Sequence, residues 1–294
     1  MCGKGDGDGL HLKTCTACKT TQYCGVACQK AHRPLHRTAC KKRSAELHDE
    51  ALFLTHPRRD DCPICFLPLQ FGKGRTVVQL CCGKVICYGC MHNMHEGLPC
   101  PYCKAFKFTS RDQFFDQIHR RIALEDDEAM NLLGCVYEEG TTVPSDLKKA
   151  FDLWSRAAEL GNVAAHYNLA GLHLDGRGVD KDAEKATRLL ELAAMGGHEA
   201  SRHNLGGLEW NAGNRRRAMR HFVIAAEGGC DSSLEHVRRG YSMDIVSKDR
   251  YEIALRAHKD SRDEVISENR SIAEGMLTLA GAVGRPYQWA GGEV

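Results

Sequence analysis

The residues that could do chemistry lie mostly in the first third of the chain. Of its 16 cysteines, 14 fall within residues 1–103, and only Cys135 and Cys230 lie beyond them. Four C-x-x-C pairs occur in that region, and such a pair can place two sulfurs on one metal ion. The opening sequence MCGKGDGDGL lacks the basic-then-apolar layout of a secretory signal, so we expect a reducing cytoplasm or nucleus. Clustered thiols there bind metal more often than they form disulfides, which favours zinc.

The densest cluster contains eight thiols within residues 62–103. Zinc takes four ligands in a tetrahedron, so eight thiols suit two ions. Two of the eight, Cys81 and Cys82, are adjacent. Adjacent cysteines raise the question whether both bind zinc or only one of them does. The order along the chain is Cys62, Cys65, Cys81, Cys82, Cys87, Cys90, Cys100 and Cys103.

Residues 60–108 resemble a RING finger, with CPIC at 62–65 and CPYCK at 100–104 as its signatures. The resemblance implies two cross-braced zinc ions. One would be held by Cys62, Cys65, Cys87 and Cys90, and the other by Cys81, Cys82, Cys100 and Cys103.

The adjacent cysteines depart from the commonest RING pattern. That pattern has C-x-H ahead of the fifth ligand and would put Lys84 in the place of the histidine, although an ammonium is a poor zinc ligand. All-cysteine members of the family place the fourth ligand five positions before the fifth, which is the interval from Cys82 to Cys87. Cys81 then becomes the third ligand, and both neighbours have a role. The alternative ligands are His92 and His95.

A RING finger implies a ubiquitin ligase, which holds a charged ubiquitin-conjugating enzyme and has no nucleophile of its own. The family's contact surface maps onto Ile64, Met94, Pro101 and Lys104. Met94 stands where many active members have tryptophan. Lys104 replaces an arginine and keeps its charge without the planar fork of donors. The alternative is a zinc-stabilised interaction module without ligase activity.

An earlier cluster reads Cys15-x2-Cys18-x5-Cys24-x3-Cys28-x7-His36-x3-Cys40. Its TQYCGVACQKAH run and closing H-x3-C resemble a MYND finger, within a module of residues 1–43. The resemblance implies a first zinc ion bound by Cys15, Cys18, His36 and Cys40. A second would need a pair upstream of Cys24 and Cys28, where the chain offers Cys2 and has Gly5 three residues later. His11 is the remaining candidate, so we expect one or two zinc ions in this finger.

The formal net charge is only +2, but residues 1–60 have eleven Lys/Arg against six Asp/Glu. The run KKR at 41–43 directly follows the last cysteine of the first cluster. A solvated basic face is the favoured interpretation, because a short basic run carries no sequence code for nucleic acid. No stretch approaches the roughly 18 apolar residues of a membrane span, so we expect a soluble protein.

Beyond residue 110 the sequence repeats itself. AAELG at 157–161 returns as AAMGG at 193–197 and AAEGG at 225–229, and NLLG at 131–134 returns as NLAG at 168–171 and NLGG at 204–207. A period of 32–37 residues with two apolar-periodic stretches per unit predicts stacked helical hairpins. Small residues would let paired helices approach closely, and Trp154, Leu190 and Phe222 would fill the space between layers.

These units resemble Sel1-like repeats, relatives of the tetratricopeptide repeat, over about residues 127–264. The scattered Cys135, Cys230, His166, His198 and His203 form no close-spaced pairs, and we expect structural roles for them. The predicted fold class is therefore cross-braced zinc fingers followed by an all-α solenoid of about four helical hairpins. The remaining segments are a helical linker at 44–59, a linker helix at 109–126 and a disordered tail at 265–294.

The order of modules resembles multi-copy families of diatoms and related algae. The Sel1-like repeats imply protein partners and the RING-like finger implies a ubiquitin-conjugating enzyme among them, while nucleic acid and membrane are disfavoured. Two functions stay open at this point. One is a RING-type ubiquitin ligase whose repeats select the substrate, and the other is a non-enzymatic scaffold that uses all three modules for binding.

Overall fold

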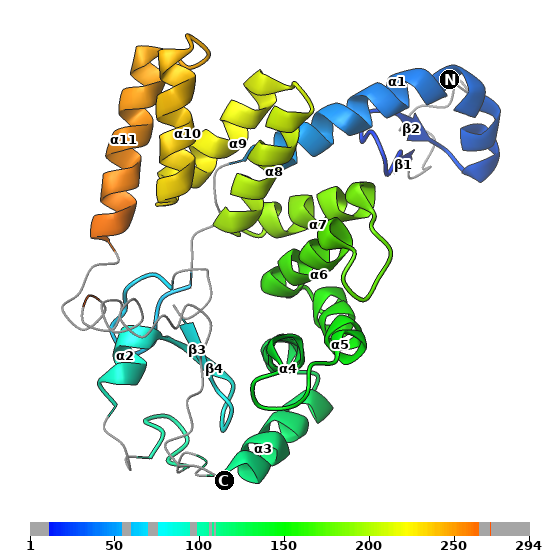
Figure 1. Cartoon of the computed structure of the whole chain (residues 1–294). Helices are drawn as coiled ribbons and strands as arrows, with labels where there is room; N and C mark the ends of the chain where they lie inside the picture. Colours follow the sequence, from blue (N-terminus) through cyan, green and yellow to red (C-terminus); the bar gives the residue numbers. More distant parts are fainter. Residues whose placement is uncertain are drawn as a thin grey trace. The chain divides into compact units, whose positions relative to one another are not determined.

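A computed structural model of the chain describes residues 12–54, 60–69, 76–94, 99–105, 108, 110–264 and 271 (Figure 1). The chain divides into two compact units, residues 1–54 and 55–294. Within the described ranges, every helix is too short or too polar to cross a membrane.

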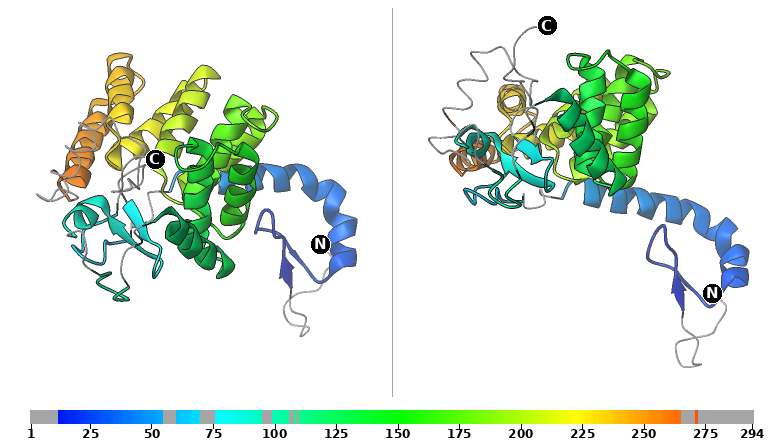
Figure 2. Two further views of the ribbon diagram at one scale, coloured as in Figure 1. Left: turned by 60° about the horizontal axis from the view of Figure 1, so that its bottom comes forward. Right: turned by 90° about the horizontal axis from the view of Figure 1, so that it is seen from below.

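The first unit is a small hairpin beside one long helix. Strands β1 (Lys13–Thr14) and β2 (Gln22–Tyr23) pair antiparallel, and helix α1 spans Val26–Leu52. Pro34 lies inside α1, where its ring removes a backbone donor, and the helix bends in the part nearer its start (Figure 2). The charged segment expected to be a linker helix is thus, up to Leu52, the C-terminal third of α1.

The second unit begins with a compact zinc module. Strands β3 (Thr76–Gln79) and β4 (Lys84–Cys87) form an antiparallel hairpin, followed by the short helix α2 (Tyr88–His92). Their buried core consists of Val77, Ile86 and three cysteines, Cys62, Cys87 and Cys90. So small an apolar core cannot stabilise a module alone, and structural metals are the usual supplement.

From Arg111 to Asp263 the second unit is helical, as the 3.6-residue periodicity predicted. A single helix, α3 (Arg111–Ala123), precedes four hairpins in which each helix packs on the next (Figures 1 and 2). The hairpins are α4 (Asp127–Glu139) with α5 (Leu147–Glu159), α6 (Val163–Asp175) with α7 (Ala183–Met195), α8 (Glu199–Asn211) with α9 (Arg215–Glu227), and α10 (Asp231–Ser242) with α11 (Lys248–Asp263). The predicted solenoid is confirmed.

The helix caps fix the register of the repeat. Asp126, Asn162 and His198 cap α4, α6 and α8, and these positions are 36 residues apart. Aligning NLLG with NLAG by their letters gives an offset of 37 residues, which is wrong by one. NLAG begins one residue later in its helix, counted from the cap, than NLLG does. Gly134 is therefore equivalent to Ala170, and not to Gly171.

The corrected register shows how helix pairs approach each other. A Cβ atom at Gly134 would lie 2.5 Å from Trp154 Nε1, and one at Gly206 would lie 2.6 Å from Phe222 Cε1. Trp154 is fully buried and donates its Nε1–H to the carbonyl of Asn131 at 3.2 Å. The glycines are thus required by the aromatic rings that the facing helices insert.

His198 makes one cap sensitive to pH. Its Nδ1 accepts the Ser201 backbone N–H at 3.2 Å, and the ring is 5 % exposed and lies tilted against the Tyr167 ring. Burial lowers its pKa to about 4. An unfolded histidine titrates near 6.5, so between pH 6.5 and 4 the unfolded chain binds the extra proton and stability falls as pH falls.

We expect wild type to lose about 2 kcal/mol more than His198→Asn when the pH drops from 7.5 to 5. Asparagine makes the same cap at Asn162, whose Oδ1 accepts the Ala165 N–H at 2.9 Å, and it does not titrate. Urea unfolding of both proteins at the two pH values, followed by helix circular dichroism, measures the difference. Equal losses in both proteins would contradict this role of His198.

Candidate metal centres

Three C-x-x-C turns share one backbone conformation. The residue after the second cysteine has a positive φ in each: Lys19 at 55°, Phe66 at 56° and Lys104 at 60°. Its N–H donates to the carbonyl of the first cysteine, at 2.9, 2.8 and 2.9 Å respectively. A left-handed residue other than glycine costs roughly 1–2 kcal/mol. Metal binding by the two sulfurs can compensate this cost, so the turns are built as zinc knuckles.

In the first unit, Cys15, Cys18, His36 and Cys40 come together, with all four ligand atoms within 4.8 Å of one another. Sulfurs bound to one tetrahedral zinc at about 2.3 Å lie about 3.8 Å apart. The separation of Cys15 Sγ and Cys40 Sγ is 3.7 Å, and Cys18 Sγ lies 3.3 Å from His36 Nε2. These distances suit a zinc ion bound through Nε2.

Two threonines that the sequence analysis did not single out, Thr20 and Thr21, support this site. Thr21 Oγ1 lies 3.3 Å from His36 Nδ1, so with zinc on Nε2 the Nδ1–H donates to the hydroxyl and fixes the ring. The Thr20 hydroxyl donates to Cys18 Sγ at 3.2 Å and, with backbone N–H groups, lowers the pKa of Cys18 to about 5. A thiolate is therefore available for metal at neutral pH. The TT pair right after the knuckle was the signal in the sequence.

Among the described residues, Cys24 and Cys28, the ligands expected for a second zinc ion in the first finger, belong to no set of four ligand atoms. Cys24 and Cys28 are half-buried, and Cys28 packs against the buried cluster of Cys15, Cys18 and Tyr23. Cys2 and His11 lie outside the described residues. The second zinc ion of this finger therefore stays a prediction.

The second unit gathers its eight thiols into two sets of four. One set is Cys62, Cys65, Cys87 and Cys90, and the other is Cys81, Cys82, Cys100 and Cys103. Cys65 Sγ lies 3.8 Å from Cys87 Sγ, and Cys82 Sγ lies 3.7 Å from Cys100 Sγ, again the edge of a zinc tetrahedron. Pairs of ligands alternate between the sets along the chain, so the sets are interleaved.

The electrostatics of both sets favour one thiolate near neutral pH. Burial raises the pKa of Cys62, but N–H groups of Cys87, Cys65 and Ile64 outweigh it and lower the pKa to about 7. Burial likewise raises the pKa of Cys100, and N–H groups of its own knuckle lower it to about 7. The first cysteine of each knuckle is thus prepared for metal.

The adjacent cysteines occupy the turn between β3 and β4. The N–H groups of Cys82 and Gly83 both donate to the carbonyl of Gln79, at 3.0 and 2.7 Å, which closes a tight loop. Gly83 has a φ of 74° and takes the left-handed position that follows a knuckle's second cysteine. The sulfurs of Cys81 and Cys82 both belong to the set with Cys100 and Cys103. Lys84 and His92, the other residues considered as ligands, are exposed and belong to neither set. His95 lies outside the described residues.

The residues expected to contact a conjugating enzyme fall into two groups. Ile64 and Met94 are half-buried and both pack against the core of Cys62, Val77 and Ile86. Pro101 and Lys104 are exposed, and the Lys104 ammonium donates to the Pro101 carbonyl at 3.1 Å. Met94 therefore packs on the zinc module's own core.

The turn with the adjacent cysteines also contacts the first repeat. Leu80, directly before Cys81, is 4 % exposed and belongs to one buried cluster with residues of α3 and α4. The helix residues of this cluster are Phe114, Ile118, Ala129, Leu132, Leu133 and Val136. The zinc module and the repeats thus share a core.

A second contact leads from the same turn to the cap of α4. A side chain at Gly83 would collide with the Arg121 guanidinium. Arg121 donates through Nε to Asp126 Oδ2 at 2.7 Å, and Asp126 Oδ1 caps α4 by accepting the Ala129 N–H at 2.9 Å. This connection could not be predicted from the sequence, because these side chains meet only in the fold.

Comparison with known proteins supports the first finger and the helical repeats. The family model of the MYND finger matches residues 1–40, and that of the Sel1 repeat matches residues 127–162, 163–198 and 203–230. None of the curated proteins matches the chain. The protein is thus a cysteine-rich region suited to binding zinc, followed by a helical solenoid of Sel1 repeats.

Several solved structures are similar to the helical part. A Sel1 repeat protein from Oxalobacter formigenes is 22 % identical with a TM-score of 0.46, and the match covers 61 % of this chain and 75 % of that one. The protective antigen c5321 of uropathogenic Escherichia coli, which displays an SLR fold, is 26 % identical with a TM-score of 0.44 over 58 % of this chain and 37 % of its own. Immunity protein Pa5087 from Pseudomonas aeruginosa is 16 % identical with a TM-score of 0.32, covering 52 % of this chain and 76 % of that one.

Proposed function

We propose that residues 60–105 form a RING-type module and that the chain is a ubiquitin ligase whose Sel1 repeats bind the protein substrate. The observation that carries the proposal is the interleaved order of the two thiol sets, with ligand pairs alternating between them. Each set offers four thiols, so a zinc ion there has no open position for an activated water. The zinc ions are structural, and the module acts by holding a conjugating enzyme's thioester.

The contact surface of the module supports this function. Ile64 and Met94 both lie half-buried on the core of the first thiol set, so each leaves part of an apolar side chain accessible. Pro101 and Lys104 are exposed on the knuckle of the other set. Such a combination of apolar and cationic groups suits a standard protein contact, with a few central side chains supplying most of the affinity.

Autoubiquitination by the purified, zinc-loaded protein against a panel of conjugating enzymes tests the proposal. We expect chains with at least one enzyme and about a tenfold or greater loss in Ile64→Ala, because a central contact residue typically contributes more than 1 kcal/mol. Leu69→Ala is the matched control, since Leu69 packs half-buried against the same core and lies outside the predicted contact surface.

Equal loss in both variants would mean that the module's packing matters and the contact does not. No chains with any enzyme, from protein shown to hold its zinc, would leave the second candidate. That candidate is a non-enzymatic scaffold, which the zinc-suited region and the Sel1 repeats support on their own.

A further inference from the structure

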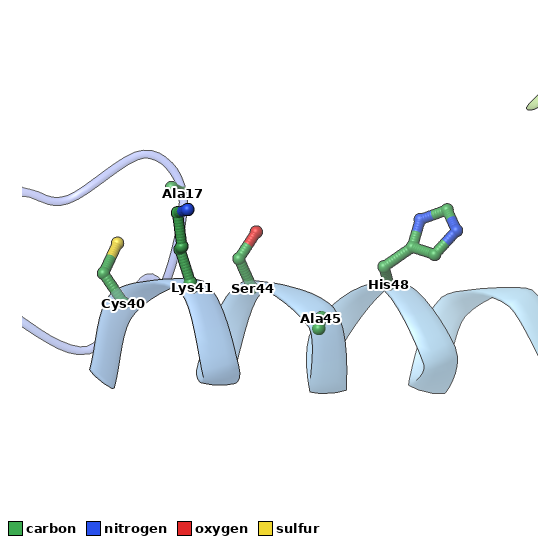
Figure 3. A pocket seen from close by; sticks show the side chains of 6 residues that line it. All are labelled: Ala17, Cys40, Lys41, Ser44, Ala45 and His48. Atoms are coloured by element: carbon green, nitrogen blue, oxygen red, sulfur yellow. The ribbon is translucent and has the colours of Figure 1, made fainter. Parts of the chain in front are cut away.

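An open hollow of about 440 Å³ lies in the first unit, between the first knuckle and α1 (Figure 3). Its walls come from two segments. Ala17 belongs to the turn between Cys15 and Cys18, and the other residues follow one another along the helix. The lining residues are Ala17, Cys40, Lys41, Ser44, Ala45 and His48.

The polar groups of the hollow share one face of α1. Lys41, Ser44 and His48 are spaced by three and four residues, which places them above one another on a helix. Figure 3 shows the three side chains pointing to the same side of α1. Arg37 precedes Lys41 by four residues and is exposed, so the face continues as a basic row.

Two of the three acidic residues of α1 lie away from this face, while Asp49 directly follows His48 and lies on the side of Ala45. The residues that line the hollow, all within the described chain, include no carboxylate. Glu46 and Glu50 instead bond the Arg43 guanidinium, at 3.1 and 2.9 Å, and Arg43 lies two residues, or roughly 200°, around the helix from Lys41. With zinc bound, the three thiolates and the histidine beside the hollow carry a net negative charge, which opposes an acidic ligand. Attraction of such a ligand therefore has to come from Lys41 and the exposed Arg37.

The hollow adjoins the finger and extends beyond it, because Ala17 and Cys40 of the finger line it together with residues further along α1. The match to the MYND finger ends at residue 40, and the charged lining residues begin at Lys41. We propose that this face binds an acidic protein segment, whose Glu or Asp side chains meet Lys41, Ser44 and His48. Single-stranded nucleic acid fits less well, because its binding sites combine cations with aromatic side chains for base stacking, and the lining residues include no Phe, Tyr or Trp.

Fluorescence anisotropy with a labelled peptide of alternating glutamate and serine tests this site on the full, zinc-loaded chain. We expect Lys41→Glu to weaken binding about tenfold and Lys42→Glu to weaken it less than threefold, because reversing a charge at the contact adds direct repulsion. The two variants change the net charge equally, and Lys42 lies about 100° around the helix. The same peptide with glutamine for glutamate should not bind.

Zinc content and circular dichroism establish that each variant is folded. If Lys41→Glu loses zinc, Ser44→Glu places a carboxylate on the same face and is expected to weaken binding about tenfold. Equal weakening by Lys41→Glu and Lys42→Glu would overturn the proposal, since only net charge would then matter. Tighter binding of a single-stranded oligonucleotide than of the acidic peptide would also overturn it. Neither outcome depends on ligase activity.

Discussion

Removing zinc from the folded protein is expected to expose the first repeat while leaving the last helices protected. Cys81 and Cys82 lie in the turn that also carries Leu80, and Leu80 is buried among Phe114 and Ile118 of α3. Structural zinc typically contributes about 10–16 kcal/mol of binding free energy that is also folding free energy. Without the ion, we expect the turn to open and Leu80 to leave this cluster more often.

Hydrogen exchange of the chain before and after chelation measures this coupling. We expect faster exchange in α3 and at the start of α4, whose cap Asp126 is bonded by Arg121 beside Gly83, and unchanged exchange in α10 and α11. Leu80→Ala in zinc-loaded protein should reproduce part of the effect, at about 2–5 kcal/mol.

Two cysteine variants separate metal loss from thiol chemistry. Cys82→Ser removes a ligand of the second set, whereas Cys230→Ser changes a half-buried cysteine at the start of α10. Only Cys82→Ser is expected to release zinc and increase exchange in α3. Unchanged exchange in α3 and α4 after complete chelation would show that the repeats fold independently of the zinc module.

The sequence predicted local features well and long-range contacts poorly. Thiol spacing is a local property, and the structure brings together the same sets of four side chains that the spacing and the family resemblances implied. Repeats are visible because small residues recur wherever helices approach closely. By contrast, the contact of Leu80 with α3 depends on residues more than 30 positions away, and the spacing of hydrophobic residues does not encode such a partner.

The register of the repeat shows a further limit. NLLG and NLAG look alike, but similarity of letters does not fix which face of a helix a residue occupies. The caps Asp126 and Asn162 were the better signal, because each must stand directly before its helix. His198 hid the third cap, since histidine rarely has that role and its position showed only in the folded chain.

The second large effect is expected on the free energy of unfolding, from substitutions at Trp154 and Gly134. The Trp154 indole occupies space that is open only because residue 134 has no side chain. Trp154→Leu is expected to destabilise the protein by about 2–4 kcal/mol, since it leaves a cavity beside Gly134 and removes the bond to the Asn131 carbonyl. Gly134→Ala is expected to cost about 1–3 kcal/mol, because the new methyl group would lie 2.5 Å from Trp154 Nε1.

The double variant should be more stable than the sum of the two losses predicts. Alanine and leucine occupy the equivalent positions of the next repeat, Ala170 and Leu190, and both are buried there. Combining Gly134→Ala with Trp154→Leu therefore installs a pair that this solenoid already accommodates, and the methyl group fills part of the cavity. We expect a favourable coupling of about 1–2 kcal/mol in urea unfolding, as found for side chains in contact. Strictly additive losses would contradict the close approach of Gly134 and Trp154, because side chains in contact are expected to show a coupling energy.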